Sequence, residues 1–147
     1  MAMNPATASI LGLTVSFFAL AALVLRQALI AAAPAGILVQ VLALSIMVWA
    51  RFTFGRRSFN ASAAPTAGGL VTNGPYKYLR HPIYAAALYL TWAGVLTHPS
   101  FLNFLIGLVP TAGLAVRMLA EERLVAAEYP GYAAYAARTK RVIPFLL

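Results

Sequence analysis

The feature that most limits how this chain can fold is a run of 35 residues without a charged side chain, residues 82–116. Two shorter uncharged runs precede it, residues 1–25 and 27–50. A membrane-spanning helix needs about 20 mostly apolar residues, so each of these shorter runs predicts one span. As one helix, the longest run would measure roughly 52 Å, which is more than the hydrocarbon core of a bilayer. We therefore expect it to fold back at His98, Pro99 and Ser100, which gives four spans.

The composition agrees with a chain that lies mostly in lipid. Of the 147 residues, 62% are hydrophobic and only 10% are charged, which is far more apolar than a typical soluble domain. We predict an all-α integral membrane protein with about four transmembrane helices and an interfacial, C-terminal helical segment in the cytoplasm. No internal repeat is visible, so residues 1–147 are interpreted as one domain. In it, residues 1–50 form an anchoring helical hairpin and residues 51–147 carry the chemistry.

The net charge of +8 is distributed in a way that indicates membrane topology rather than nucleic-acid binding. Basic residues gather between the second and third spans and after the fourth, whereas Arg26 alone lies near the first connection. Because cytoplasmic loops are enriched in Lys and Arg, we expect both termini and the polar segments in the cytoplasm, in a bacterial inner membrane. Such residues also contact anionic headgroups of the bilayer. The two groups are Arg51, Arg56, Arg57, Lys77 and Arg80, and then Arg117, Arg123, Arg138, Lys140 and Arg141.

The sequence gives little support for thiolate or metal sites or for a soluble nucleotide-binding fold. The chain has no cysteine, two histidines and three acidic residues, all Glu, which excludes thiolate catalysis and argues against a metal site. No Gly-x-Gly-x-x-Gly follows a strand pattern, which excludes a soluble nucleotide-binding fold.

The C-terminal part predicts a helix that continues past the fourth span. Residues 120–129 can extend this span until Pro130 and Gly131 interrupt it. A short helix over residues 132–138 would then place Tyr132 and Tyr135 on one face. Its plainest interpretation is an interfacial helix with an aromatic and basic rim.

Polar residues flank the longest uncharged run at both of its ends. His81 lies 18 residues before Pro99, and Arg117 lies 18 residues after it. In a helical hairpin, residues at equal distance from the turn lie at the same depth, so these two should meet. Glu121 follows one turn after Arg117 on the same face and should point toward the group around His81. That group comprises Tyr76, His81 and Tyr84.

Each of these residues also has a plainer interpretation. His81 can cap a helix, and Arg80 can reach lipid phosphates from a helix end. Single tyrosines are common at membrane interfaces, and Arg117 with Glu121 can form a solvated pair. None of this explains why the polar groups gather at one end of the hairpin while its other end carries only His98.

Several segments carry a resemblance to a known family. They are residues 70–76 (LVTNGPY), 80–84 (RHPIY), 129–135 (YPGYAAY) and 141–144 (RVIP), together with Arg117, Glu121 and Glu122. In order and spacing they resemble the isoprenylcysteine carboxyl methyltransferase family, within the phospholipid methyltransferase-like superfamily. The resemblance covers about the C-terminal 80 residues. The Arg-His-Pro-x-Tyr segment is shared with phospholipid methyltransferases and some sterol reductases.

The resemblance implies a membrane enzyme that uses S-adenosylmethionine as cofactor. It also implies that Arg117 is a catalytic and substrate-binding residue, since it falls where the family uses an arginine to hold the methyl acceptor. The residues implied for the cofactor pocket are Gly68, Gly69, Leu70, Val71, Tyr76, His81, Pro82, Ile83, Tyr84 and Glu121.

The chemistry leaves more than one acceptor open. A carboxylate is already ionised near neutral pH and needs only a positioning cation, which Arg117 can supply. The first hypothesis is therefore carboxyl O-methylation of a lipidic or prenylcysteine-like acid at the cytoplasmic face. An amine would need a base, for which Glu122 is the candidate, and phospholipid or small-amine N-methylation is the alternative. A non-enzymatic membrane scaffold with the same fold, self-association, and a partner subunit that completes the acceptor pocket also stay open.

Overall fold

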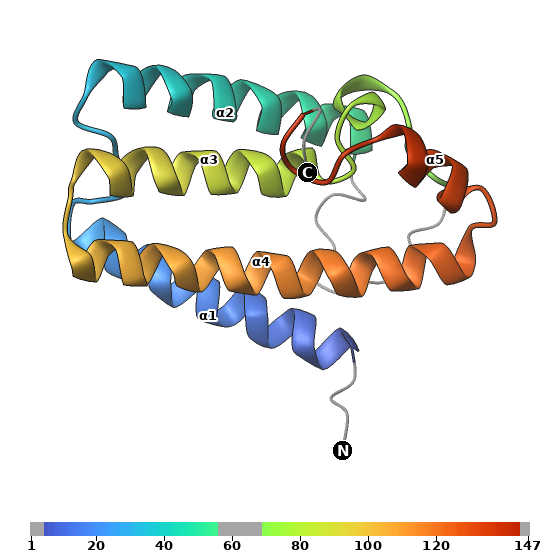
Figure 1. Ribbon diagram of the computed structural model, residues 1–147, viewed down its shortest axis with the longest axis horizontal. Helices are drawn as coiled ribbons and strands as arrows, with labels where there is room; N and C mark the ends of the chain where they lie inside the picture. Colours follow the sequence, from blue (N-terminus) through green and yellow to red (C-terminus); the bar gives the residue numbers. More distant parts are fainter. Residues whose placement is uncertain (1–4, 56–68, 145–147) are drawn as a thin grey trace.

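The structure is a computed structural model that describes residues 5–55 and 69–144 (Figure 1). The elements are α1 (Pro5–Leu25), α2 (Pro34–Phe54), the 3-10 helix η2 (Gly74–Lys77), α3 (Pro82–Thr97), α4 (Phe101–Glu128) and α5 (Tyr132–Arg138). Within these residues there is no β-strand, and Leu79 and Lys140 form an isolated parallel bridge. The described part of the chain is therefore all-helical, as predicted.

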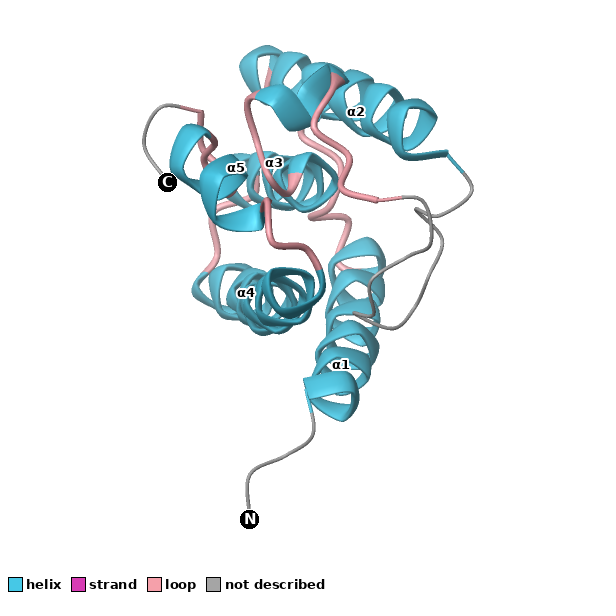
Figure 2. Ribbon diagram, turned by 90° about the vertical axis from the view of Figure 1, so that its right-hand side faces the viewer, coloured by secondary structure: helices cyan, strands magenta, loops and turns pink. Residues whose placement is uncertain are grey.

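The four long helices alternate in direction and form two pairs. The α1–α2 connection and the α3–α4 turn lie at one end of the bundle, and α5 lies at the other (Figure 1). Seen from the α5 end, α2 lies over α3, and α1 lies beside α4 (Figure 2). The most extensive packing is of α1 on α4 and of α2 on α3. The pairs meet where α3 faces α4.

Small residues allow α1 and α4 to approach closely where they cross. A Cβ atom added to Gly12 would lie 2.9 Å from the carbonyl oxygen of Gly113. Ser16 is buried in the same crossing and donates a hydrogen bond to the Gly12 carbonyl at 2.6 Å. Small residues at helix crossings are typical of membrane bundles, in which close packing rather than the hydrophobic effect joins the helices.

Most of the predicted boundaries are confirmed. The chain reverses at residues 98–100, α4 continues to Glu128, and α5 covers the predicted residues 132–138. The uncharged run that predicted the second span ends at Ala50, yet α2 continues to Phe54. Arg51 does not end the helix, because a cation in the last turn interacts favourably with the helix dipole.

The outer surface of the bundle is strongly apolar. Phe17, Phe52 and Phe101 are exposed by 67%, 84% and 79%. Two helices of the described residues are long and apolar enough to cross a membrane, Pro34–Phe54 and Phe101–Glu128, and the apolar helical segments Ile10–Leu25 and Pro82–Thr97 are shorter. Soluble monomers rarely expose contiguous apolar surface of this kind, so the surface indicates a membrane protein.

Candidate active site

The start of α3 and the last part of α4 meet at the α5 end of the bundle. The hydroxyl of Tyr84, in the first turn of α3, accepts a hydrogen bond from Arg117 Nε at 2.5 Å. The same hydroxyl donates to Glu121 Oε1 at 2.5 Å, and Arg117 Nη2 lies 3.2 Å from that oxygen. We call these three residues the triangle. The predicted meeting of the two polar ends of the hairpin is therefore confirmed.

The guanidinium of the triangle is buried. Arg117 is only 5% exposed, and its Cζ lies 5.8 Å from the centroid of the Tyr84 ring. A buried cation needs a charged or hydrogen-bonding partner, and Glu121 and Tyr84 provide both. The Glu121 side chain keeps 22% of its surface exposed, so its carboxylate can still contact a ligand. A merely solvated surface pair does not describe this arrangement.

His81 lies between two carboxylates. Its ring stacks on Tyr84, with centroids 5.5 Å apart and planes inclined by 15°. Nε2 lies 3.2 Å from Glu122 Oε1, and Nδ1 lies 3.8 Å from Glu121 Oε2. The side chain makes no capping hydrogen bond to α3. His81 therefore connects the triangle to Glu122.

Glu122 binds a separate set of cationic groups. Its Oε2 accepts hydrogen bonds from Arg141 Nε at 3.1 Å and from Arg141 Nη2 at 2.9 Å. Arg80 Nε lies 3.1 Å from Oε1, as an ion pair without the alignment of a hydrogen bond. The Glu122 side chain is 13% exposed. We call Arg80, Glu122 and Arg141 the clamp, because they join the start of α3, the end of α4 and the C-terminal tail, residues 139–144.

Backbone hydrogen bonds hold the tail beside the residues that precede α3. The Arg80 amide donates to the Lys140 carbonyl at 2.7 Å, and the Lys140 amide donates to the Tyr78 carbonyl at 3.1 Å. The His81 amide donates to the Arg141 carbonyl at 3.1 Å. The position of His81 therefore depends on the tail as well as on α3.

Tyr76 lies in η2 and links α2 to α5. Its ring packs on Phe54 with centroids 5.4 Å apart, and its carbonyl accepts a hydrogen bond from the Tyr135 hydroxyl at 2.8 Å. Burial, with a smaller effect from Tyr135, raises the pKa of Tyr76 above its ordinary range. The negative charge of Glu121 adds a smaller rise to the pKa of this phenol.

The predicted aromatic face of α5 exists, but it is turned inward. Tyr132 and Tyr135 are both buried, and their ring centroids are 6.1 Å apart. Burial and the negative charge of Glu122 raise the pKa of Tyr132 to about 12. Burial and the neighbouring Tyr132 raise the pKa of Tyr135 above its ordinary range. These two tyrosines of α5 therefore belong to the core around the clamp and not to an exposed rim. In the clamp itself, hydrogen bonds to Glu122 raise the pKa of Arg141.

The other residues predicted for the cofactor pocket lie on both sides of η2. Pro82 is buried at the first position of α3, and Ile83 beside it is half-buried. Gly69, with a φ of 80°, leads with Leu70 and Val71 toward η2. Leu70 and Val71 are half-buried, and within the described residues they make no hydrogen bond or ion pair with the triangle. Gly68 lies outside the described residues.

Sequence reasoning assigned no site role to Arg80, Tyr132 or Arg141. The sequence did indicate that Glu122 has cationic partners, because a carboxylate in so apolar a chain needs them. Arg80 and Arg141 also lie in segments that carry the family resemblance. Which cations reach Glu122 depends on how the tail folds back, and no spacing in the sequence predicts that.

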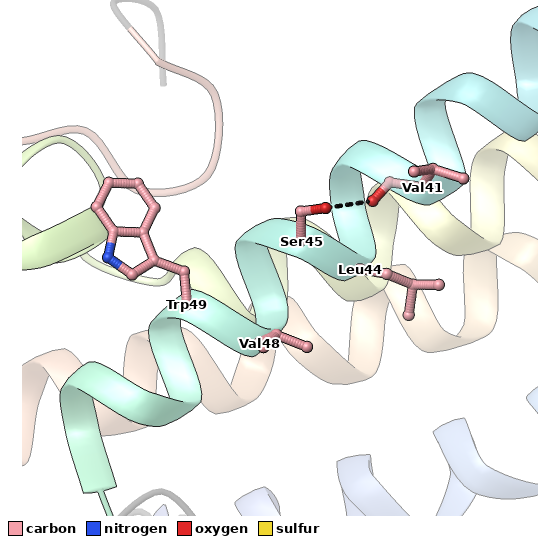
Figure 3. Close-up of a pocket in the computed structure, with 5 residues that line it drawn as sticks. All are labelled: Val41, Leu44, Ser45, Val48 and Trp49. Carbon is pink, nitrogen blue, oxygen red and sulfur yellow. Dashed lines mark hydrogen bonds between the residues drawn. The ribbon is translucent and has the colours of Figure 1, made fainter.

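A shallow surface hollow of about 470 Å³ lies elsewhere, on the outer face of α2 (Figure 3). A single helix lines it, and its one hydroxyl, Ser45 Oγ, donates to the Val41 carbonyl of the same helix at 2.9 Å. Its other polar side-chain group is the indole N–H of Trp49, so the hollow has no charged or titratable group for chemistry. Its lining residues are Val41, Leu44, Ser45, Val48 and Trp49.

The fold and the site together define a membrane protein in which a cluster of charged and aromatic residues lies at one end of an apolar helical bundle. The sequence matches the phospholipid methyltransferase family over residues 33–131, more than half of the chain. The chain belongs to this family, whose members are membrane methyltransferases. The matched region contains the triangle, His81 and Glu122, and it ends before α5 and the tail. No curated protein and no solved structure matches the chain.

Proposed function

We propose that this protein is an S-adenosylmethionine-dependent methyltransferase that acts on the carboxylate of a lipidic or prenylcysteine-like acid. The family supplies the class of reaction. The observation that carries the choice of acceptor is the triangle, in which a buried guanidinium lies at the mouth of an apolar bundle. A carboxylate with an apolar tail matches both parts of this environment.

In this proposal the chain forms one domain with four spans, and the lengths of the helices support the four spans. At 1.5 Å per residue, α1 and α2 each measure roughly 31 Å, which fits a hydrocarbon core of about 30 Å. α3 measures roughly 24 Å and begins after a polar segment, whereas α4 measures roughly 42 Å. The last turns of α4 therefore extend beyond the hydrocarbon. The charge distribution supports placing the site and both termini in the cytoplasm.

The donor set fits an amino acid that carries a sulfonium group. The Glu121 carboxylate suits an ammonium group, and the faces of Tyr84 and His81 suit a sulfonium. When bound, S-adenosylmethionine supplies a methyl group that is displaced directly from sulfur. We assign Tyr76, Pro82, Ile83 and residues 68–71 to the remaining wall of this pocket.

Arg117 holds the acceptor in this proposal. Its planar fork can bind a carboxylate through two parallel hydrogen bonds. Because Glu121 already shares this guanidinium, a ligand ammonium that draws Glu121 away strengthens the hold of Arg117 on the acceptor. The two ligands should therefore favour each other's binding.

The residues have little acid–base work to do in such a transfer. One C–O bond forms between the acceptor oxygen and the methyl carbon, one C–S bond breaks, and the electron pair of that bond stays on sulfur. No proton moves, so the site must align the two groups and exclude water. A half-buried triangle at the end of an apolar bundle suits both requirements.

N-methylation of a phospholipid headgroup or a small amine is the second candidate, since the family's description names phospholipids. It would need a base to take the amine proton, and Glu122 is the carboxylate available for this role. Glu122 is bound by Arg141, Arg80 and His81, and cationic partners make a carboxylate a weaker base. This is why we place the carboxylate acceptor first.

Binding of S-adenosylhomocysteine, measured by calorimetry and by the thermal midpoint of the protein in detergent, tests the proposal. At a hundredfold excess over Kd, a ligand of the folded state stabilises it by about 2.7 kcal/mol. Glu121→Ala and His81→Ala should weaken binding at least tenfold. The chain offers matched controls, Glu128→Ala on the exposed end of α4 and His98→Ala at the other end of the bundle, which should bind like the parent.

The absence of binding at millimolar ligand would end the methyltransferase proposal and leave the membrane scaffold. Binding that Glu121→Ala and His81→Ala leave unchanged would show that the pocket has been assigned to the wrong residues.

A further inference from the structure

A second polar contact lies at the opposite end of the bundle, where the α1–α2 connection meets the α3–α4 turn (Figure 1). Arg26 is exposed, and its Nε donates a hydrogen bond to Asn103 Oδ1 at 2.6 Å. Asn103 is 5% exposed, and its Nδ2 donates to the His98 carbonyl at 3.0 Å. Both ends of the amide are engaged, so its oxygen is held toward Arg26. A buried residue thereby orients an exposed cation.

The outer edge of this guanidinium is available to a ligand. Among the described residues, the side chain of Arg26 makes no hydrogen bond or ion pair other than the one from Nε. Its two terminal nitrogens carry four of the five N–H donors of an arginine side chain. Two such donors side by side match two oxygens of a phosphate group.

The surroundings of Arg26 are those of a lipid headgroup region. Leu25, Ile30 and Phe101 lie at the same end of the bundle and are exposed by 86%, 77% and 79%. Side chains so apolar and so exposed fit acyl chains rather than water. An arginine directly after such a helix end lies at the depth of the headgroup phosphates. The apolar neighbours therefore favour a lipid over a free anion.

We infer that Arg26, oriented by Asn103, binds the phosphate group of a phospholipid at the end of the bundle opposite the candidate active site. The contact ties one lipid to the junction between the α1–α2 connection and the α3–α4 turn. Anionic phospholipids bind most tightly, because Arg26 gives the site a positive charge. This inference depends on the membrane location of the chain and not on methyl transfer.

The test uses full-length protein in detergent, with phosphatidylglycerol as the probe. Native mass spectrometry measures the retained lipid, and thermal midpoints over a lipid titration give the apparent affinity. Inorganic phosphate and a diacylglycerol are separate arms, which supply the phosphate without the tail and the tail without the phosphate. Of the three probes, we expect only phosphatidylglycerol to bind. Arg26→Gln should bind it at least tenfold more weakly, which is equivalent to about 1.4 kcal/mol.

Three variants separate a site from a general effect of charge. Arg26→Lys should recover only part of the affinity, because an ammonium lacks both the fork and the Nε contact with Asn103. Asn103→Leu keeps Arg26 but loses its orientation, and should weaken binding too. Arg138→Gln is the matched control, since Arg138 is an exposed arginine of α5 whose Nε donates to the Ala134 carbonyl at 3.3 Å. It should bind lipid like the parent.

The inference is overturned if Arg26→Gln retains the lipid with parental affinity, or if Arg138→Gln weakens binding equally. If Arg26→Gln lowers the thermal midpoint by the same amount with and without lipid, the Arg26–Asn103 contact only stabilises the packing of the two connections, and the inference is overturned. Equal stabilisation by inorganic phosphate and phosphatidylglycerol means a free-anion site, which also overturns the lipid assignment.

Discussion

Tyr84 and Arg117 are 33 positions apart in the sequence, and a hydrogen bond of 2.5 Å from the guanidinium Nε to the phenol oxygen joins them. The same oxygen donates to Glu121 Oε1, so one neutral hydroxyl lies between a cation and an anion. This geometry fixes the direction of the guanidinium and leaves the phenol ring stacked on His81. The orientation of Arg117 toward an acceptor should therefore depend in part on this hydroxyl group.

Replacement of Tyr84 by Phe tests this dependence. The variant removes the hydroxyl and keeps the aromatic face, so binding of S-adenosylhomocysteine should change little. Methyl transfer should fall by roughly tenfold, because a hydrogen bond to a charged group contributes about 1.5 to 3 kcal/mol and Glu121 retains part of the hold on Arg117. Tyr78→Phe makes the same chemical change at a side chain that is 54% exposed and should keep parental activity. Equal activity of both variants would contradict a positioning role for the hydroxyl.

The sequence predicted those parts of the site that depend on helix geometry alone. The turn at Pro99 and the rise per residue of two antiparallel helices were enough to place His81 and Arg117 at one depth. The i,i+4 spacing then placed Glu121 beside Arg117. Each step needed only an uncharged run, a turn and a helical period.

The clamp could not be predicted in this way. Arg141 reaches Glu122 because the tail runs parallel to residues 78–81, and this pairing involves backbone groups that carry no sequence signal. The burial of Tyr132 has the same origin, since the spacing of α5 predicts an aromatic face but not the side on which it packs. Tertiary contacts of these short segments determine both the pairing of Arg141 with Glu122 and the burial of Tyr132.

The clamp should contribute to stability more through Glu122 than through Arg141. Glu122→Gln leaves the half-buried Arg80 without its anion, which should cost about 1 to 3 kcal/mol. The Arg141 side chain is 41% exposed, so water can replace its contact and Arg141→Gln should cost less than about 1 kcal/mol. Unfolding measured for both single variants and the double variant should give less than additive losses. Glu128→Gln is the control, and a cost as large as that of Glu122→Gln would argue against the clamp.

Alkaline pH should weaken the fold through Tyr132. Its pKa is raised to about 12 by burial and by Glu122, whereas a tyrosine of the unfolded chain has a pKa of about 10. Between these values the unfolded chain releases a proton that the folded chain keeps, so the free energy of unfolding falls as pH rises. Tyr132→Phe should flatten this fall, and phenolate absorbance should show one fewer tyrosine of high pKa. An unchanged pH dependence would mean that Tyr132 ionises without loss of structure.

The last prediction distinguishes the two acceptors, and it depends on the burial of Arg117 and the pairing of Glu122. With a carboxylate acceptor, Arg117→Ala should lower transfer roughly ten- to a hundredfold, since the lost charged contact contributes about 1.5 to 3 kcal/mol. Arg117→Lys should restore only part of this, because an ammonium cannot form the planar fork. With an amine acceptor the order reverses, so that Glu122→Gln is the more damaging change and transfer rises with pH as the amine loses its proton.

Rates for this comparison must be normalised to protein that binds S-adenosylhomocysteine, because Glu122→Gln also weakens the clamp. Whether the transferred label is base-labile, as an ester is, gives an independent readout of the acceptor. A base-labile label with Arg117→Ala fully active would exclude the carboxylate-holding role of Arg117. A base-stable label together with loss of activity in Glu122→Gln would favour an amine as the methyl acceptor. It would also mean that the cationic groups around Glu122 move away from its carboxylate when the acceptor binds.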